Sequence, residues 1–251
     1  GYTSINIRGS DATRTNVTIN GIPYNDAESA GSYFVDIPDI VSSVGSIQIQ
    51  RGVGSSTNGA GAFGATINLS TNEVHDSAYA AINNSYGSFN TWKNTVAAGS
   101  GLINGKFTAD IRLSNISSDG YIDRAKSGLQ SVFLATAYIG KKTTVRFHFI
   151  TGKEKTYQAW DGVPEVIVGT DRTYNELGYI NDSTFYNNQT DNYRQTHYQL
   201  FITQQINDRW SFNLTSFLSH GIGYYEEDKT DADYKSYGIS YPVYVPGDTT
   251  D

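Results

Sequence analysis

Apolar and polar residues alternate along most of the chain after Ser77, which is the pattern of β-strands with one apolar and one polar face. The stretch 106–114 is the clearest example, because its odd positions from Phe107 to Leu113 are apolar and its even positions from Thr108 to Ser114 are polar. The pattern predicts strands near residues 77–86, 91–99, 105–116, 130–139, 143–153, 195–206 and 209–224.

The connections between these strands alternate in length after the short first turn at 87–90. The turns at 100–104, 140–142 and 207–208 are short, whereas the loops at 117–129 and 154–194 are long. A soluble sandwich gives no reason to collect its long loops at one end, but outer-membrane barrels have short periplasmic turns and long extracellular loops. The sequence therefore predicts an all-β fold, a transmembrane antiparallel β-barrel.

The first 74 residues have a different composition, which is rich in Gly, Asn, Ser and Ile. Short apolar bursts at 4–7, 17–19, 46–49 and 67–69 predict short strands separated by turns. We therefore expect two domains, a small β domain at residues 1–74 and barrel strands with their loops at residues 75–251. The chain starts without a methionine or a leader and stops in a polar run, so we expect both ends to be cuts.

Composition excludes several classes of function. A net charge of −7, with 18 Lys and Arg against 25 Asp and Glu, argues against nucleic acid as a partner. The chain has no cysteine, which excludes disulfides and thiol catalysis. It also lacks a run of about 18 apolar residues, which a membrane-spanning helix would need.

Candidate chemistry is weak at the sequence level. The four histidines are scattered without metal-binding spacing, and nothing resembles a local catalytic motif, so we expect no enzyme, no bound metal and no cofactor. Residues 59–64 fit the G-x-G-x-x-G pattern, but a strand follows where a dinucleotide site needs a helix. The acidic run 228–233 lacks the glycine and closing Glu of a calcium loop, so we interpret it as solvated charge.

Four linked motifs at 7–9, 17–23, 47–52 and 58–68 resemble the plug domain of TonB-dependent outer-membrane receptors, in its C-terminal part. The matching positions that we assign to the plug motif are Arg8, Gly9, Arg14, Asn20, Gly21, Arg51, Gly52, Gly59, Gly61 and Gly64. Asn20 and Gln48 stand where the family frequently has Asp and Glu, which indicates a subfamily. The family's energy-coupling segment would precede Gly1.

The resemblance implies a barrel of about 22 strands around the plug, of which this chain supplies about seven. It also implies active import across the outer membrane of a Gram-negative bacterium, with the TonB–ExbB–ExbD system and outer-membrane lipid as partners. The commonest substrates in this family are ferric siderophores and other iron complexes, followed by cobalamin, haem and oligosaccharides. The rival hypothesis is a non-transporting binding or adhesion protein.

Two sets of residues are candidates for function. The arginines Arg8, Arg14 and Arg51 could pair with carboxylates on the inner barrel wall, or be ordinary surface charge. Aromatic residues of the loop 154–194 are the candidate ligand contacts, because exposed aromatics supply binding area; the alternatives are a membrane-interface girdle and packing within the loop. These aromatic candidates are Tyr157, Trp160, Tyr174, Tyr179, Phe185, Tyr186 and Tyr193.

Overall fold

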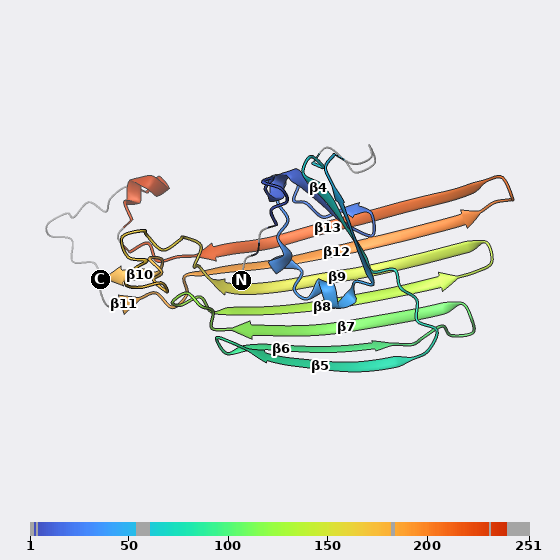
Figure 1. The fold of residues 1–251 in the computed structure, drawn as a ribbon, viewed down its shortest axis with the longest axis horizontal. Helices are drawn as coiled ribbons and strands as arrows, with labels where there is room; N and C mark the ends of the chain where they lie inside the picture. Colours follow the sequence, from blue (N-terminus) through green and yellow to red (C-terminus); the bar gives the residue numbers. More distant parts are fainter. Residues whose placement is uncertain (1–2, 4, 54–60, 182–183, 231, 240–251) are drawn as a thin grey trace, which may run out of the picture.

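The computed structural model describes residues 3, 5–53, 61–181, 184–230 and 232–239, which form a small N-terminal sheet and a large curved sheet (Figure 1). The small sheet has four strands in the order β2-β1-β4-β3 and lies on one face of the large sheet. Its elements are η1 (Ala12–Arg14), β1 (Thr15–Ile19), β2 (Ile22–Pro23), η2 (Phe34–Asp36), η3 (Ile40–Ser43), β3 (Ser46–Arg51) and β4 (Ala65–Ser70).

The large sheet is a seven-stranded antiparallel meander in the order β13-β12-β9-β8-β7-β6-β5, so every predicted strand after Ser77 is present. Its strands are β5 (Tyr79–Gly87), β6 (Thr91–Gly99), β7 (Phe107–Ser118), β8 (Ser127–Ile139), β9 (Thr143–Tyr157), β12 (Thr190–Gln205) and β13 (Ser211–Glu226). A two-stranded hairpin, β10 (Tyr179–Asn181) with β11 (Thr184–Phe185), lies in the long loop between β9 and β12. A further short helix, η5 (Tyr234–Tyr237), follows β13.

The predicted loop 154–194 is too long at both ends. β9 continues to Tyr157 and β12 begins at Thr190, and these two residues are paired across the strands. The alternation of apolar and polar residues stops near residue 153, because a strand beyond the apolar band no longer needs an apolar face. The ladder of backbone hydrogen bonds nevertheless continues to Tyr157. The connection between the two strands is therefore residues 158–189.

The predicted strand at 4–7 is also wrong within the described residues. Ile7 makes only an isolated bridge to Ser10, with reciprocal backbone hydrogen bonds of 3.0 Å. Arg8 and Gly9 between them have positive φ values of 51° and 80°, so the chain reverses within two residues. A burst this short forms one side of a tight turn instead of a strand.

The two faces of the large sheet are those that the alternation predicts. On β7, Ile111 is 42% exposed on the outer face, whereas Arg112 is 2% exposed on the face toward the small sheet. Outward apolar residues lie next to one another across the strands, as in the row Ile111, Leu134, Phe149 and Tyr198. The outer face is therefore apolar and continuous, as expected of a surface that meets lipid.

We predict that Ile111→Arg destabilises the full-length protein in lipid by about 2–4 kcal/mol, because a charged side chain near the middle of the bilayer loses its hydration. The control is Thr203→Arg, on the inner face of β12, where the new side chain meets water. Unfolding in lipid vesicles would measure both variants. Equal destabilisation by the two arginines would show that the faces are wrongly assigned.

One apolar core joins the small sheet to the wall. Val17, Ile19 and Ile37 of the N-terminal region are each 1% exposed and share a cluster with Phe133 of β8 and Ile150 of β9. The two parts approach closely at Gly152, where an added Cβ would overlap the carbonyl oxygen of Asp36. A glycine is therefore required at position 152 for η2 to lie against β9.

Candidate functional site

A buried ion cluster fixes the small sheet to the wall, and we define it as Asp39, Lys93 and Arg112. Asp39 precedes η3 and forms ion pairs with Lys93 of β6 and with Arg112 of β7, the latter at 3.3 Å. Thr95 and Ser114 each donate a hydrogen bond of 2.8 Å to Asp39 Oδ2. Burial tends to raise the pKa of Asp39, but hydrogen bonds from Lys93 and the nearby hydroxyls outweigh it and lower the pKa to about 2.

Arg112 extends this cluster to a second contact. It donates from Nε to Ser43 Oγ at 2.6 Å and from Nη1 to Ser131 Oγ at 3.2 Å, while Ser131 donates to the carbonyl oxygen of Pro38 at 2.6 Å. The side chains of Arg112 and Asp39 are both 3% exposed. The carboxylate of Asp39, from the N-terminal region, and the guanidinium of Arg112, from the wall, are thus buried together and held by several hydrogen bonds.

A separate polar contact is centred on the predicted plug-motif residue Asn20. Asn20 and Gly21 have φ values of 57° and 81°, which fits the type I′ turn that joins β1 to β2. The Asn20 amide lies 2.9 Å from Nδ1 of His148 and donates to Gln199 Oε1 at 3.0 Å. This turn therefore also touches β9 and β12.

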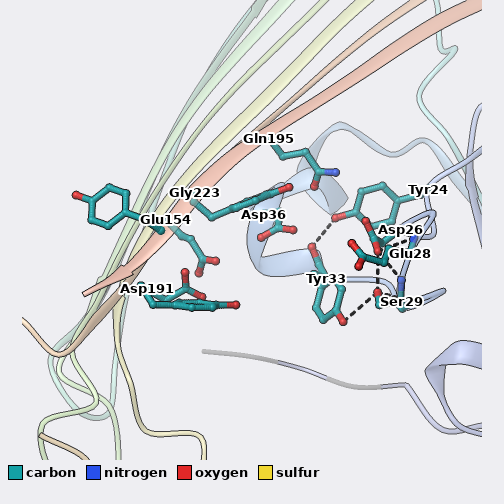
Figure 2. A pocket seen from close by; sticks show the side chains of 14 residues that line it. Tyr24, Asp26, Glu28, Ser29, Tyr33, Asp36, Glu154, Asp191, Gln195 and Gly223 are labelled. Carbon is teal, nitrogen blue, oxygen red and sulfur yellow. Dashed lines mark hydrogen bonds between the residues drawn. The ribbon is translucent and has the colours of Figure 1, made fainter. Parts of the chain in front are cut away.

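A cavity of about 490 Å³ lies between the small sheet's connecting loop and the end of the wall that carries the long loops; we call it cavity 1 (Figure 2). The residues of the connecting loop lie between β2 and η3, and the wall residues come from β9, β12 and β13. The lining is formed by Tyr24, Asp26, Glu28, Ser29, Gly31, Tyr33, Asp36, Glu154, Asp191, Tyr193, Gln195, Gly223, Tyr224 and Tyr225. Its side chains are predominantly acidic and aromatic.

The carboxyl groups of cavity 1 differ in how they are satisfied. Asp26 Oδ1 accepts hydrogen bonds from the backbone N–H groups of Glu28 and Ser29 at 3.1 and 2.7 Å, so Asp26 holds the loop in shape. Glu154 is 2% exposed and is hydrogen-bonded to Asp36, but its Oε2 atom has no partner. Figure 2 shows the carboxyl groups of Glu154 and Asp191 pointing from the wall toward Asp36.

The pKa of Asp36 is raised to about 7, mainly by burial and further by the negative charges of Asp191 and Asp26. The hydrogen bond with Glu154 acts in the opposite direction and only partly offsets these effects. Near neutral pH the connecting loop and the wall therefore share a poorly solvated carboxyl pair, and no Lys, Arg or His occurs among the described residues that line the cavity.

A second cavity of about 800 Å³, cavity 2, shares Asp191 and Tyr225 with cavity 1 and extends under the loop that follows β7. Trp160 and Tyr157 line it. Trp160 packs edge-on against Tyr225, with ring centroids 5.2 Å apart, and is 43% exposed. Together, the two cavities form the hollow at the long-loop end of the structure.

The predicted aromatic residues divide into two groups. Tyr193 lines cavity 1, and Tyr157 and Trp160 line cavity 2, although Tyr157 and Tyr193 lie within strands and not in the loop. Of the remaining four, Tyr174, Tyr179 and Phe185 pack against one another in the loop, whereas Tyr186 donates a hydrogen bond to Glu226 at the end of β13. Their function as ligand contacts stays a prediction.

Arg124 lies against two rings of this second group. Its guanidinium lies 3.9 Å from the ring centroid of Phe185 and 5.0 Å from that of Tyr179. It also donates hydrogen bonds to the carbonyl oxygens of Asn175 and Leu177. The loop after β7 and the loop after β9 thus form one packed unit.

The predicted arginines of the plug motif are all exposed: Arg8 in the turn, Arg14 at the end of η1 and Arg51 at the end of β3. Among the described residues, the ion pairs between the small sheet and the wall have the opposite polarity, with the acid on the small sheet and the bases on the wall. The pairing of these arginines with wall carboxylates stays a prediction.

Three glycines of the plug motif, Gly52, Gly61 and Gly64, lie around the ends of β3 and β4. The Gly64 N–H donates to the carbonyl oxygen of Arg14 at 2.8 Å, and the Gly52 N–H donates to that of Gly64 at 2.8 Å. Gly61 accepts from the N–H of Phe63 at 3.0 Å, and Gly59 lies outside the described residues. These bonds connect η1, β3 and β4 at the edge of the small sheet.

Sequence reasoning missed most of the lining of cavity 1, including Tyr24, Asp36, Glu154 and Asp191. Tyr24, Asp36 and Glu154 lie in no recognisable motif. Glu154 and Asp191 were predicted to lie in a loop, although they belong to strands. The available signal was the even spacing of Thr156, Glu154 and Gly152 on the inner face of β9. It was hidden because the outward neighbours Lys153 and Lys155 are also polar.

Neither a metal-binding group nor a membrane-spanning helix is found in the described part of the chain. Across the residues described, no three His, Cys, Asp or Glu side chains form a group that could hold a metal ion. None of the described helices has the length and apolar character that crossing a membrane requires.

A small β domain packed inside a curved antiparallel sheet, with charged contacts between them and a hollow facing long loops, defines a plugged β-barrel. Residues 1–66 match the family model of the TonB-dependent receptor plug domain. No curated protein sequence matches the chain. The resemblance seen in the sequence is therefore confirmed: the chain contains a TonB-dependent receptor plug domain followed by strands with the fold of the receptor barrel.

Three solved structures illustrate this fold. The chain is 15% identical to the ferric-catecholate import receptor Fiu from E. coli K12, with a TM-score of 0.66, and the match covers 88% of this chain and 33% of Fiu. The siderophore receptor PiuA from Acinetobacter baumannii is 13% identical with a TM-score of 0.65, and the match covers 88% of this chain and 30% of PiuA. The ferric citrate transporter FecA is 17% identical with a TM-score of 0.64, and the match covers 87% of this chain and 33% of FecA. The chain thus spans about a third of the length of these receptors.

Proposed function

We propose that the chain is the plug and first barrel strands of an outer-membrane importer that takes up a scarce substrate with energy from the TonB–ExbB–ExbD system. The observation that carries this proposal is the plug domain at residues 1–66 seated against the inner face of the wall. A plug blocks the lumen, so a protein that contains one needs a means of moving it before substrate can pass. We place the boundary between plug and barrel at residues 74 and 75.

A ferric siderophore or another iron complex is the substrate that the comparisons support best. Fiu, PiuA and FecA are receptors or transporters for a ferric catecholate, a siderophore and ferric citrate. Cobalamin, haem and oligosaccharides are the other candidates. The alternative class, a binding or adhesion protein that does not transport, would use the same hollow but would need no energy.

The geometry holds the plug against the wall and leaves two cavities at the long-loop end. The ion cluster and the shared apolar core hold the plug against β6, β7, β8 and β9. Cavities 1 and 2 lie at the long-loop end, where β9, β12 and β13 finish. In our proposal that end faces the outside of the cell, so substrate reaches the hollow before it reaches the plug sheet.

The test is uptake by cells that express the full-length protein, using radioactive iron supplied as a panel of ferric siderophores. We expect accumulation that requires both this protein and a functional TonB, and none in cells lacking either. Surface binding that is equal with and without TonB, with no internal iron, would favour the adhesion alternative. Uptake of labelled cobalamin, haem or an oligosaccharide, and not of iron, would retain import and change the substrate.

A further inference from the structure

Cavity 1 contains buried acid without a basic partner. Among the described residues that line it, none is Lys, Arg or His, whereas Asp26, Glu28, Asp36, Glu154 and Asp191 are all acidic. Glu154 is the decisive residue, because it is 2% exposed and its Oε2 atom has no hydrogen-bond partner although it lines the cavity. Burying a carboxylate in this way is unfavourable unless a positive group or a proton compensates it.

The contrast with the ion cluster shows what is missing. Asp39 is buried to a similar degree, but Lys93, Arg112 and three hydroxyl groups satisfy its oxygens. Glu154 and Asp36 are hydrogen-bonded to each other, and a hydrogen bond between two carboxyl groups supplies no positive charge. The fold therefore supplies counter-ions where it holds the plug in place and leaves them out where the plug borders the hollow.

Aromatic rings complete the lining of cavity 1. Tyr24 and Tyr33 come from the plug, and Tyr193 and Tyr225 come from β12 and β13. Tyr24 donates its hydroxyl hydrogen bond to the carbonyl oxygen of Tyr33, so the plug rings are fixed in position. An ammonium group gains from carboxylates and from the faces of aromatic rings, and a lining of both is typical of sites for organic cations.

The size and surroundings of cavity 1 agree with a small cationic group. A volume of about 490 Å³ falls within the range of small-molecule sites. The segment 154–194 next to it contains seven acidic and three basic residues, which attracts cations and repels anions over a distance of about a Debye length. A metal ion fits less well, since no group of three ligating side chains occurs among the described residues.

We propose that cavity 1 binds an organic cation, a primary ammonium or similar group of the imported substrate, between Glu154, Asp36 and the tyrosine rings. This inference rests on the proposed import function and names a chemical feature of its cargo. A strongly anionic ferric complex without an amine would be repelled by this lining. The cargo is then a molecule, iron-bearing or not, that presents a positive group to the top of the plug.

The test uses the purified full-length receptor in detergent and the fluorescent primary amine dansylcadaverine as the probe. We expect saturable binding at cavity 1, at least about tenfold weaker for the neutral N-acetyl derivative of the probe. Glu154→Gln keeps the shape of the side chain and removes the charge, and it should weaken binding of the amine about tenfold or more. Glu165→Gln, an exposed acid on the same long loop, is the matched control and should leave binding unchanged.

Equal binding of the amine and its acetylated derivative would overturn the proposal and favour a neutral ligand such as a sugar. Unchanged affinity in Glu154→Gln would overturn it as well. If that variant does not fold, Asp36→Asn from the plug side tests the same cavity, with the same expected loss. Failure of the import function would appear separately, as TonB-independent uptake or no uptake in cells, whatever the amine probe does.

Discussion

Replacing Asp39 with alanine should weaken the contact between the plug and the wall by about 3–5 kcal/mol of free energy, because removal of one partner leaves buried charge uncompensated. Arg112 would keep its hydrogen bonds to Ser43 and Ser131 but would lose its carboxylate, and Lys93 would lose the same partner. Lys93 is 35% exposed in its side chain and can turn to water, so most of the cost falls on Arg112.

The measurement is hydrogen exchange of the segment 34–44 in the full-length protein, together with thermal unfolding. Asp11→Ala is the control within the plug; it removes an exposed carboxylate that caps the short helix η1, so a much smaller loss than in Asp39→Ala is expected. The double variant Asp39→Leu with Arg112→Met should recover part of the loss, since two matched apolar side chains leave no unpaired charge at that contact. A loss below about 1 kcal/mol in Asp39→Ala would show that the ion cluster does not hold the plug.

Replacing residues 159–188 with a short Gly/Ser linker should abolish high-affinity binding of the substrate while the barrel stays folded, because surface loops tolerate change better than strands. The boundaries keep Tyr157 and Gln158, which are buried, and Gln189 and Thr190, which are hydrogen-bonded to them or paired with them. The deletion removes Trp160 from cavity 2 and the packed unit around Arg124.

Single substitutions distinguish loop residues that contact the substrate from residues that only hold the loop in shape. Trp160→Ala should cost about 1–3 kcal/mol in binding if the indole contacts the substrate in cavity 2. Tyr174→Ala should cost less, because Tyr174 packs against Tyr179 in the loop and does not line either cavity. Tyr234→Ala, an exposed ring in η5, is the aromatic control and should change nothing.

Uptake and equilibrium binding with matched surface expression would measure these variants. If the loop deletion binds as tightly as the wild type, recognition lies in cavity 1 and in the plug. The loop would then be a surface for other partners.

The sequence alone determined the strands and their faces. A strand repeats every two residues, so the alternation from Phe107 to Ser114 sets which side chains face outward, whatever the strand later packs against. The plug motif likewise carries its own local geometry, since Asn20–Gly21 specifies a tight turn without help from distant residues. These features depend on neighbours in the chain, which is why a single sequence predicts them.

Only the tertiary structure decided which charges meet. Asp39 precedes η3 and meets bases on β6 and β7, while Asp36, three residues earlier, meets another acid on β9. Nothing in the local sequence distinguishes these two aspartates. Their environments differ because the register of β6 to β12 places Lys93 and Arg112 opposite one and Glu154 and Asp191 opposite the other. Contacts of this kind depend on residues far apart in the chain, and the alternating pattern carries no information about them.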